Sequence, residues 1–323
     1  MLAIAIKFLI AIVMLGVLLL TLLATMWLER KTLAHFQFRV GPMRTGFHGI
    51  LQPIADAVKM VVKEMTMPDE ADPILYTAAP FIVFIPAFMV LVAIPFTDTL
   101  RATNLNMGIL YVMAVLSIST IGYMMAGWAS HNKYSLLGCM RSIGQFVSYE
   151  LPMGLSVMAV VMMAGSLNLN TIVQAQASEW FIFKWYIFRQ PFAFIIFFIA
   201  LNAEICRIPF DLPEAESELV AGFHVEYSGM RFALLLMAEY IGLLTLTSIC
   251  TCMFLGGWHG PILPGIVWFF LKTFGLIFIL FWTRATFPRV RQDQLMSLGW
   301  KVLIPVSLIN VVITGVLIML RIY

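Results

Sequence analysis

Long apolar runs separated by short polar connections occur along the whole chain. Eight of these runs have close to the roughly 20 residues that a helix needs to cross the hydrocarbon core of a bilayer. Helices are the expected spanning structure, because open strands would leave backbone polar groups without hydrogen-bond partners in lipid. The pattern predicts eight transmembrane helices, at about residues 2–28, 73–96, 107–129, 143–165, 181–203, 232–255, 262–283 and 299–320.

A shorter amphipathic pattern occupies residues 49–64, between the first two predicted spans. Its polar and apolar positions fall on opposite faces of a helix. The polar face holds Gln52, Asp56, Lys59 and Lys63, and the apolar face Leu51, Ile54, Val58 and Val61. The segment is too short to span, so we expect it to lie in the cytoplasmic interface. Periodicity alone favours a surface helix over one that walls the mouth of a lipid-phase ligand tunnel.

Composition supports an all-α polytopic membrane protein. The chain has 323 residues, of which 61% are hydrophobic and 11% charged, far from the values of soluble globular domains. We see no Gly/Ser-rich linker, low-complexity tract or obvious repeat, so we expect residues 1–323 to form a single integral membrane domain. The formal net charge of +3 is too small to indicate a nucleic-acid partner.

Lys and Arg residues are distributed asymmetrically between the two sides of this topology. Fourteen lie in connections after odd-numbered spans, five lie on the opposite side, and Lys272 lies within the seventh span. By the positive-inside rule, the odd-numbered connections, including residues 206–231, face the cytoplasm or mitochondrial matrix. We therefore expect both termini on the periplasmic or intermembrane side of a bacterial plasma (inner) membrane or a mitochondrial inner membrane.

The cysteines do not form a pattern typical of a metal site. Cys139 and Cys206 stand apart, while Cys250 and Cys252 share an apolar helix on which their thiols would diverge. The five histidines are scattered over separate connections. We expect no metal ion or iron–sulfur cluster in this chain, because cluster ligation needs a four-thiolate set.

Acidic residues gather in residues 204–231, and this stretch carries the strongest functional signal. They are Glu204, Asp211, Glu214, Glu216, Glu218 and Glu226, and Glu239 follows in the next span. Acids are costly beside hydrocarbon, so membrane proteins gather them mainly to move ions or protons. The alternative is a solvated connection, but Glu204 and Glu239 each lie within or at the end of an apolar segment.

The acids of residues 211–218 would share one face if this segment were helical. Asp211, Glu214 and Glu218 would then form a stripe, and Glu216 would point away. Asp211 would be a plausible helix N-cap. Three carboxylates on one face repel one another, and a shared proton, water or the nearby Arg207 would ease that repulsion.

Ionisable residues also lie within or beside the predicted spans. The acids are Glu29, Glu150, Glu204 and Glu239. An ion pair with Lys272 is the structural alternative, but one lysine cannot satisfy four carboxylates. Pro152 follows Glu150 closely and frees a backbone carbonyl, which lets water enter the helix. We therefore favour a proton relay over structural pairing.

Motifs along the whole chain carry a family resemblance. The longest extends from Ala203-Glu204 through residues 209–222 to Glu226-Tyr227-Ser228-Gly229. Others are Glu29-Arg30-Lys31, Arg39-x-Gly41-Pro42, Gln52-Pro53-x-Ala55-Asp56, Ala126-Gly127-Trp128, Lys133-Tyr134, Ser148-Tyr149-Glu150, Gly256-Gly257-Trp258, Arg284-Ala285 and Asp293-Gln294-Leu295-Met296. Together they resemble the quinone-site membrane subunit of respiratory complex I, which is the H subunit of the bacterial enzyme and subunit 1 of the mitochondrial one. The chain departs from the family pattern at Ala57, Cys206 and Gln292, which removes no acid or arginine.

The resemblance implies a subunit of proton-translocating NADH:quinone oxidoreductase that forms the quinone tunnel and links quinone reduction to proton pumping. It implies coupling acids at Glu29, Glu150, Glu204, Asp211, Glu214, Glu216, Glu218, Glu226 and Glu239. It implies tunnel residues at Arg30, Arg39, Asp56, Arg284 and Arg289. Headgroup reduction is then expected on a partner subunit, so the chain alone would not be catalytic.

The resemblance also implies the molecules around this chain. Ubiquinone or menaquinone would be the substrate, and NADH, FMN and iron–sulfur clusters would belong to partner subunits. The partners would be peripheral-arm subunits at the quinone site, small membrane subunits, antiporter-like pumps and lipids.

Two other functions stay open at this point. One is the equivalent subunit of a related membrane-bound hydrogenase, of a ferredoxin- or F420-driven dehydrogenase, or of the photosynthetic NDH complex. The other is a stand-alone proton-coupled carrier. Carriers tend to show inverted repeats with broken helices in both halves, whereas here the acids crowd one connection and its flanking helices.

Overall fold

The computed structural model describes residues 2–177, 184–213, 216–261 and 263–320; for residues 2–15, 216 and 217 it describes the course of the backbone. Every regular element in these ranges is helical. Six of the described helices are long and apolar enough to cross a membrane. The predicted class, an all-α polytopic membrane protein, is confirmed.

The fold is a bundle of long helices that are connected by short helices and loops. The longer ones are α1 (Leu2–Phe36), α3 (Pro73–Val90), α4 (Gly108–Ala129), α5 (Lys133–Ala164), α10 (Gly229–Phe254), α11 (Gly265–Thr286) and α13 (Ile304–Met319). The shorter ones are α2 (Gln52–Val62), α6 (Leu169–Ala175), α7 (Tyr186–Arg189), α8 (Pro191–Glu204), α9 (Glu216–Leu219) and α12 (Gln292–Ser297). Three single turns are η1 (Phe47–Gly49), η2 (Leu91–Ala93) and η3 (Gly222–His224), and a π-helical segment, η4 (Leu298–Leu303), joins α12 to α13.

The fifth predicted span differs most from the structure. Its described part consists of the four-residue α7 and the 14-residue α8, so it is not one helix of spanning length. The break falls at Gln190, whose φ of −130° and ψ of 58° are not helical. Pro191 explains this, because the residue before a proline is disfavoured in the α conformation. Residues 181–183 lie outside the described part, and the number of membrane crossings stays a prediction.

The fourth predicted span is longer than its hydropathy indicated. α5 begins at Lys133, ten residues before the predicted start at residue 143, and has 32 residues. The side chain of Asn132 caps it by accepting a hydrogen bond from the Tyr134 backbone N–H at 2.9 Å. Polar residues of the first turns, such as Arg141, hid this part of the helix from a hydropathy pattern.

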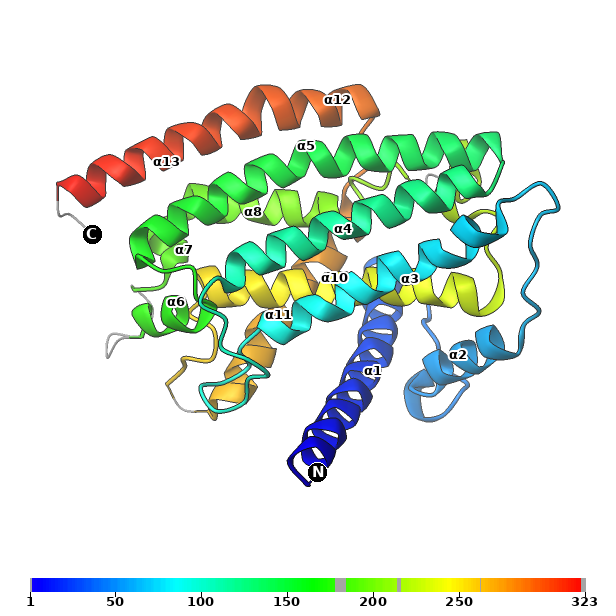
Figure 1. Ribbon diagram of the computed structural model, residues 1–323, viewed down its shortest axis with the longest axis horizontal. Coiled ribbons are helices and arrows are strands. Elements are labelled where there is room, and N and C mark those ends of the chain that lie inside the picture. Colours follow the sequence, from blue (N-terminus) through cyan, green and yellow to red (C-terminus); the bar gives the residue numbers. More distant parts are fainter. Residues whose placement is uncertain (1, 178–183, 214–215, 262, 321–323) are drawn as a thin grey trace.

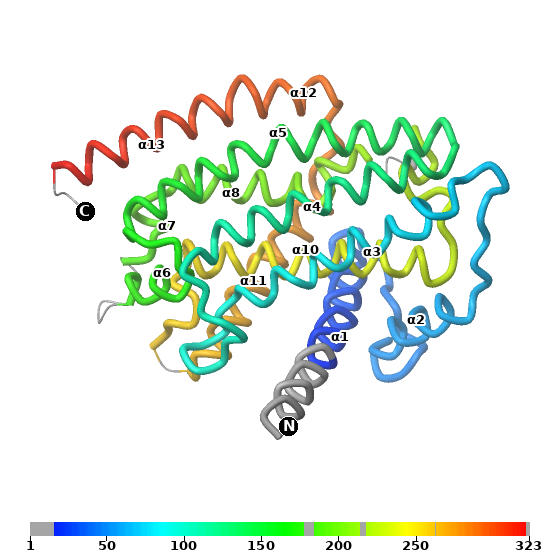
Figure 2. The backbone as a smooth tube through the Cα atoms, viewed as in Figure 1, coloured from blue at the N-terminus to red at the C-terminus, as the bar shows by residue number. Residues whose placement is uncertain are grey.

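Figure 1 shows α3, α4, α5 and α10 along the long axis of the molecule, with α12 and α13 along one edge. α8 packs against α5, and α11 packs against α10 and α1. In Figure 2, α1 runs at a steep angle to these helices, and α2 contacts both α1 and α10. The connection from α8 to α10 packs through η3 and α9 on α5, so the acidic stretch of the sequence lies against that long helix.

Lys272 on α11 binds the backbone segment that follows the C-terminal end of α10. Its ammonium group donates hydrogen bonds to three backbone carbonyl oxygens: Leu255 at 2.6 Å, Gly257 at 2.9 Å and His259 at 2.8 Å. Its Nζ also lies 4.2 Å from the ring centroid of Trp185. The structural ion pair between Lys272 and a buried Glu is not formed among the described residues, because the lysine binds carbonyl groups instead.

Candidate functional site

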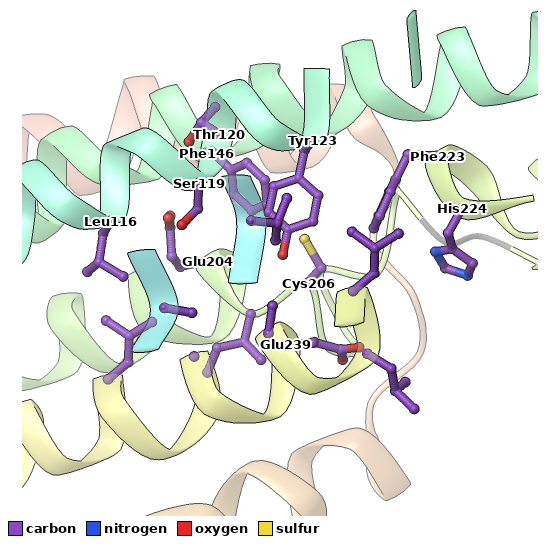
Figure 3. A pocket seen from close by; sticks show the side chains of 18 of the residues that line it. Leu116, Ser119, Thr120, Tyr123, Phe146, Glu204, Cys206, Phe223, His224 and Glu239 are labelled. Atoms are coloured by element: carbon purple, nitrogen blue, oxygen red, sulfur yellow. The ribbon is translucent and has the colours of Figure 1, made fainter. Parts of the chain in front are cut away.

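A cavity of about 190 Å³ lies among α3, α4, α5, α8 and α10. Figure 3 shows Glu204 beside Ser119 at one part of it and Glu239 below Cys206 at another, with His224 at the far end. Apolar side chains form most of the remaining wall. The structure thus brings together two acids that are 35 positions apart in sequence, in a space with room for several water molecules.

Glu150 on α5 faces the same region as Glu204. The Ser117 hydroxyl on α4 donates a hydrogen bond to Glu150 Oε1. Glu204 Oε2 is buried and makes no hydrogen bond with the described residues. The two carboxylates are near enough for their charges to interact. A buried carboxylate oxygen without a hydrogen-bond partner is costly, so a water molecule bound to Glu204 Oε2 would stabilise this site.

Arg207 links two of the predicted acids beside this cavity. Its Nη1 lies 2.5 Å from Glu29 Oε1 on α1, and its Nε lies 2.7 Å from Glu239 Oε1 on α10. The side chains of Arg207 and Glu29 are only 7% and 3% exposed. Because Glu239 also lines the cavity, Arg207 connects α1 to the cavity wall.

Two further side chains bind Glu29. Arg284 Nη1 on α11 pairs with Glu29 Oε1, and the Tyr240 hydroxyl donates a hydrogen bond to Glu29 Oε2 at 2.7 Å. The Arg207 guanidinium lies 4.9 Å from the centroid of the Tyr240 ring. Two arginines therefore balance two carboxylates, and loss of one member would leave a buried charge unpaired. We call this group the Arg207 cluster: Glu29, Arg207, Glu239, Tyr240 and Arg284.

The one-face arrangement of Asp211, Glu214 and Glu218 required a helix over residues 211–218. Residues 211–213 are irregular, and the described helix in this stretch is α9, Glu216–Leu219. Leu212 precedes Pro213, which disfavours the α conformation there. Glu214 and the side chain of Glu216 lie outside the described residues, so the predicted three-acid face cannot be placed.

Asp211 has a different role from the expected helix N-cap. Its Oδ2 lies 3.0 Å from Arg289 Nη2, in an ion pair between the acidic connection and the segment that follows α11. Arg207, which was expected near the acids of this connection, points instead to Glu29 and Glu239. The charge that offsets Asp211 thus comes from a distant part of the chain.

Glu218 and Glu226 of the acidic connection bind residues at the N-terminal end of α5. Arg141 Nη1 lies 2.6 Å from Glu218 Oε2, and the Glu218 side chain is 53% exposed. The hydrogen bond and charge of Arg141 hold the pKa of Glu218 below its ordinary value. Glu226 Oε1 accepts a hydrogen bond from Asn132 Nδ2 at 2.5 Å. Neither residue is among those that line the cavity.

The amphipathic helix is present as α2, and Asp56 is fixed on its polar face. Arg30 Nη1 lies 2.5 Å from Asp56 Oδ2, and Gln52 Nε2 donates to Oδ1 at 3.1 Å. Burial acts to raise the pKa of Asp56, but the hydrogen bond and charge of Arg30 outweigh it, so the pKa lies below its ordinary value of 3.8. The apolar side chains of Ile54 and Val58 are exposed, so α2 presents an open apolar face.

The five expected tunnel residues do not meet at one point. Arg30 and Asp56 bind each other, Arg284 belongs to the Arg207 cluster, and Arg289 binds Asp211. Arg39 is exposed in the connection after α1. They occupy separate positions around α1, α2 and α11 rather than a single pocket.

Sequence reasoning missed Tyr240 and the pairing of Arg207. Tyr240 directly follows Glu239 in an apolar span, and a phenol next to an intramembrane acid is a signal that could have been used. The pairing of Arg207 with Glu29, 178 positions away, could not be predicted, because Arg207 also lies close in sequence to several other acids. Among the residues that the structure describes, no group of three or more His, Cys, Asp or Glu side chains could hold a metal ion.

The fold and the Arg207 cluster define a class: a polytopic helical membrane protein whose bundle holds carboxylates balanced by arginines. The family model described as NADH dehydrogenase matches residues 8–315, so the chain belongs to that family. It is 53% identical over 295 residues to the H subunit of the NADH-quinone oxidoreductase of Geobacillus thermodenitrificans (strain NG80-2), covering 90% of this chain and 87% of the relative. It is 49% identical over 323 residues to an H subunit, numbered 2, of the NADH-quinone oxidoreductase of Geobacter metallireducens (strain ATCC 53774 / DSM 7210 / GS-15), covering 94% and 92%.

These relatives confirm the resemblance drawn from the motifs. A third, the H subunit of the NADH-quinone oxidoreductase of Dehalococcoides mccartyi (strain CBDB1), is 48% identical over 304 residues, covering 94% of this chain and 84% of the relative. The assignment as one membrane subunit of an oxidoreductase complex is confirmed. It decides against the stand-alone carrier.

Proposed function

We propose that this chain walls the quinone-access tunnel of a proton-pumping NADH:quinone oxidoreductase and couples quinone reduction to proton translocation. One observation carries the proposal: Arg207 binds Glu29 and Glu239 together, and Glu239 lines the cavity that also receives Glu204. Paired charged groups therefore extend from α1 to the cavity wall, and the cavity separates Glu239 from Glu204. The names of the relatives supply quinone as the substrate.

The Arg207 cluster acts as the junction of the relay. A guanidinium that lies between two carboxylates is attracted more strongly to the one that is anionic. A change of charge on Glu29 therefore changes the strength of the ion pair between Arg207 and Glu239. Glu239 then exchanges a proton with water in the cavity, and Glu204 and Glu150 carry it toward the α4–α5 side. Such a step needs titratable groups and room for water between them, and the cavity, with Glu204 and Glu239 in its wall, offers both.

The quinone path lies on the other side of α1. Arg30 and Asp56 form a fixed pair beside the open apolar face of α2, which suits an isoprenoid chain that enters from lipid. Arg39, Arg284 and Arg289 continue the path toward the quinone headgroup. Because Arg284 also binds Glu29, it joins the quinone path to the Arg207 cluster.

The acidic connection, residues 206–231, lies on the cytoplasmic or matrix side, and both termini lie on the opposite side. There Asp211, Glu218 and Glu226 form the mouth of the relay and face the peripheral-arm subunits, and Glu214 and Glu216, whose side chains lie outside the described residues, are assigned to the same relay by the resemblance alone. Headgroup reduction and the cofactors NADH, FMN and iron–sulfur clusters belong to those partners, and the antiporter-like pumps and small membrane subunits receive the signal within the membrane.

Paired substitutions at Glu204 test the relay. Glu204→Gln keeps the volume and the hydrogen-bonding atoms but removes the exchangeable proton. We expect it to lower quinone-linked turnover and proton pumping together, because a blocked proton step stalls the electron step. Glu204→Asp should retain more of both, since water can bridge the missing methylene.

Activity with a water-soluble acceptor needs only the peripheral arm and should survive in both variants. Native gels confirm that each variant complex is assembled. Full assembly with wild-type turnover and pumping in Glu204→Gln would overturn the relay. Poor assembly and loss of all activities in both variants would indicate that Glu204 has only a structural role.

A further inference from the structure

Gln145 on α5 holds both ends of the segment that carries the relay groups. Its Nε2 donates a hydrogen bond to the Ala203 carbonyl oxygen at 2.6 Å and another to the Phe210 carbonyl oxygen at 2.8 Å. The residue is 1% exposed. One side chain thus fixes the last turn of α8 and the residue just before Asp211.

The chemistry of the two contacts determines the orientation of the amide. Both partners are carbonyl oxygens, which only accept hydrogen bonds, so the NH₂ group and not the oxygen of Gln145 must face them. An amide NH₂ has two hydrogens, and the two carbonyl groups use both. Gln145 Oε1 makes no hydrogen bond with the described residues, so the amide is held through its NH₂ group.

The segment between these two points contains both parts of the proposed relay. Glu204 follows Ala203 directly, and Arg207 lies midway, where its carbonyl oxygen accepts a hydrogen bond from Phe210 N–H at 2.8 Å. Arg207 N–H donates to Asn202 O at 3.4 Å. The backbone is thus a compact turn, and fixing its two ends fixes the position of Arg207 relative to Glu204.

We propose that Gln145 is a positioning residue, which sets Glu204 against the cavity and Arg207 between Glu29 and Glu239. The expected effect of Gln145 on quinone-linked activity rests on the proposed relay. Its expected effect on the backbone conformation of residues 203–210 does not. Glutamine is suited to this place because two donors on one planar group are required. Methionine has a similar length and no donor, and asparagine has both donors but is one methylene shorter.

The thiol of Cys206 reports on the turn directly. It lies within the segment and lines the cavity, and its Sγ is 3.8 Å from Gln145 Nε2. Cys139, which is 1% exposed and lies on α5 outside the segment, serves as the internal reference. The experiment treats the assembled complex in native membranes with a small thiol reagent and measures modification of each cysteine by peptide mass spectrometry.

In Q145M, we expect Cys206 to react on the order of tenfold faster than in the wild type, because two lost hydrogen bonds make local opening of the turn more frequent. Q145N should give an intermediate rate. Cys139 should react at the wild-type rate in every variant. The matched control is S142A, which removes a buried hydroxyl one turn away. Among the described residues this hydroxyl bonds only to Gly138 O, within α5, so its loss should leave the rate at Cys206 unchanged.

A wild-type rate at Cys206 in Q145M would overturn the inference, and so would equal acceleration of Cys206 and Cys139, which signals general loosening. If Q145M does not assemble, the same criteria apply to Q145N.

Measurements of quinone-linked turnover distinguish a failure of this inference from a failure of the relay. With the relay intact, Q145M lowers quinone-linked turnover and adds little to the loss already caused by E204Q. Wild-type turnover in E204Q with fast labelling in Q145M would refute the relay and leave the positioning role standing.

Discussion

At the scale of single residues, Glu29 has the most demanding environment. It is 3% exposed and binds Arg207, Arg284 and Tyr240 at once. Glu29→Gln would leave two guanidinium groups with one carboxylate, so we predict a destabilisation of about 3–5 kcal/mol, the usual effect of breaking a buried pair. The yield of assembled complex on native gels should fall strongly.

Tyr240→Phe is the matched control for Glu29→Gln. It removes one hydrogen bond to Glu29 and keeps all charges, so we expect a loss of only about 1 kcal/mol and near-normal assembly. If both variants assembled equally well, Glu29 would not be the centre of the cluster.

The sequence identified the important acids but not their partners. Glu29, Glu204 and Glu239 could be found because charges are rare in apolar segments and costly there. Their partners could not, because an arginine side chain reaches several acids and only the packing of α1, α10 and the connection after α8 decides between them. Arg207 is the example, since its sequence neighbour Asp211 is paired with Arg289 instead.

At the scale of elements, α2 is the helix whose function is most open to test. We predict that Asp56→Leu raises the apparent KM for quinone, because it frees Arg30 and removes the fixed pair beside the apolar face. Turnover with a water-soluble acceptor should stay normal. Unchanged quinone kinetics in an assembled complex would indicate that α2 is only a surface helix.

The pH dependence of this effect follows from the pKa of Asp56. Because Arg30 lowers that pKa below 3.8, the contribution of the pair is present above the ordinary pKa and is lost only as the pH falls through the lower folded value. The ratio of mutant to wild-type KM should therefore be the same from about pH 6 to about pH 8. A ratio that changes over this range would show that another group titrates at the proposed tunnel mouth.

Hydropathy predicted which segments are helical better than where they begin and break. It placed α4 and α10 within a few residues, because their ends coincide with polar connections. It missed the start of α5, where a capping asparagine begins the helix ahead of its apolar part, and the break before α8, which depends on one proline.

At the scale of the whole molecule, the distribution of Lys and Arg predicts the orientation. A protease site inserted in residues 206–231 should be cut only from the cytoplasmic side, and a tag after Tyr323 should be accessible only from outside. Both follow from the excess of basic residues in the odd-numbered connections. Cleavage of the acidic connection in intact cells would reverse the topology and remove the proposed contact with the peripheral arm.

The proposed relay requires that reduction of quinone moves a proton at Glu204. Infrared difference spectra of the assembled complex, recorded on quinone reduction, can detect this step, because a protonated carboxyl group absorbs apart from a carboxylate. We expect a carboxyl signal in the wild type that is lost in Glu204→Gln and shifted in Glu204→Asp. Identical difference spectra for the wild type and Glu204→Gln, in complexes of equal quinone occupancy, would contradict it.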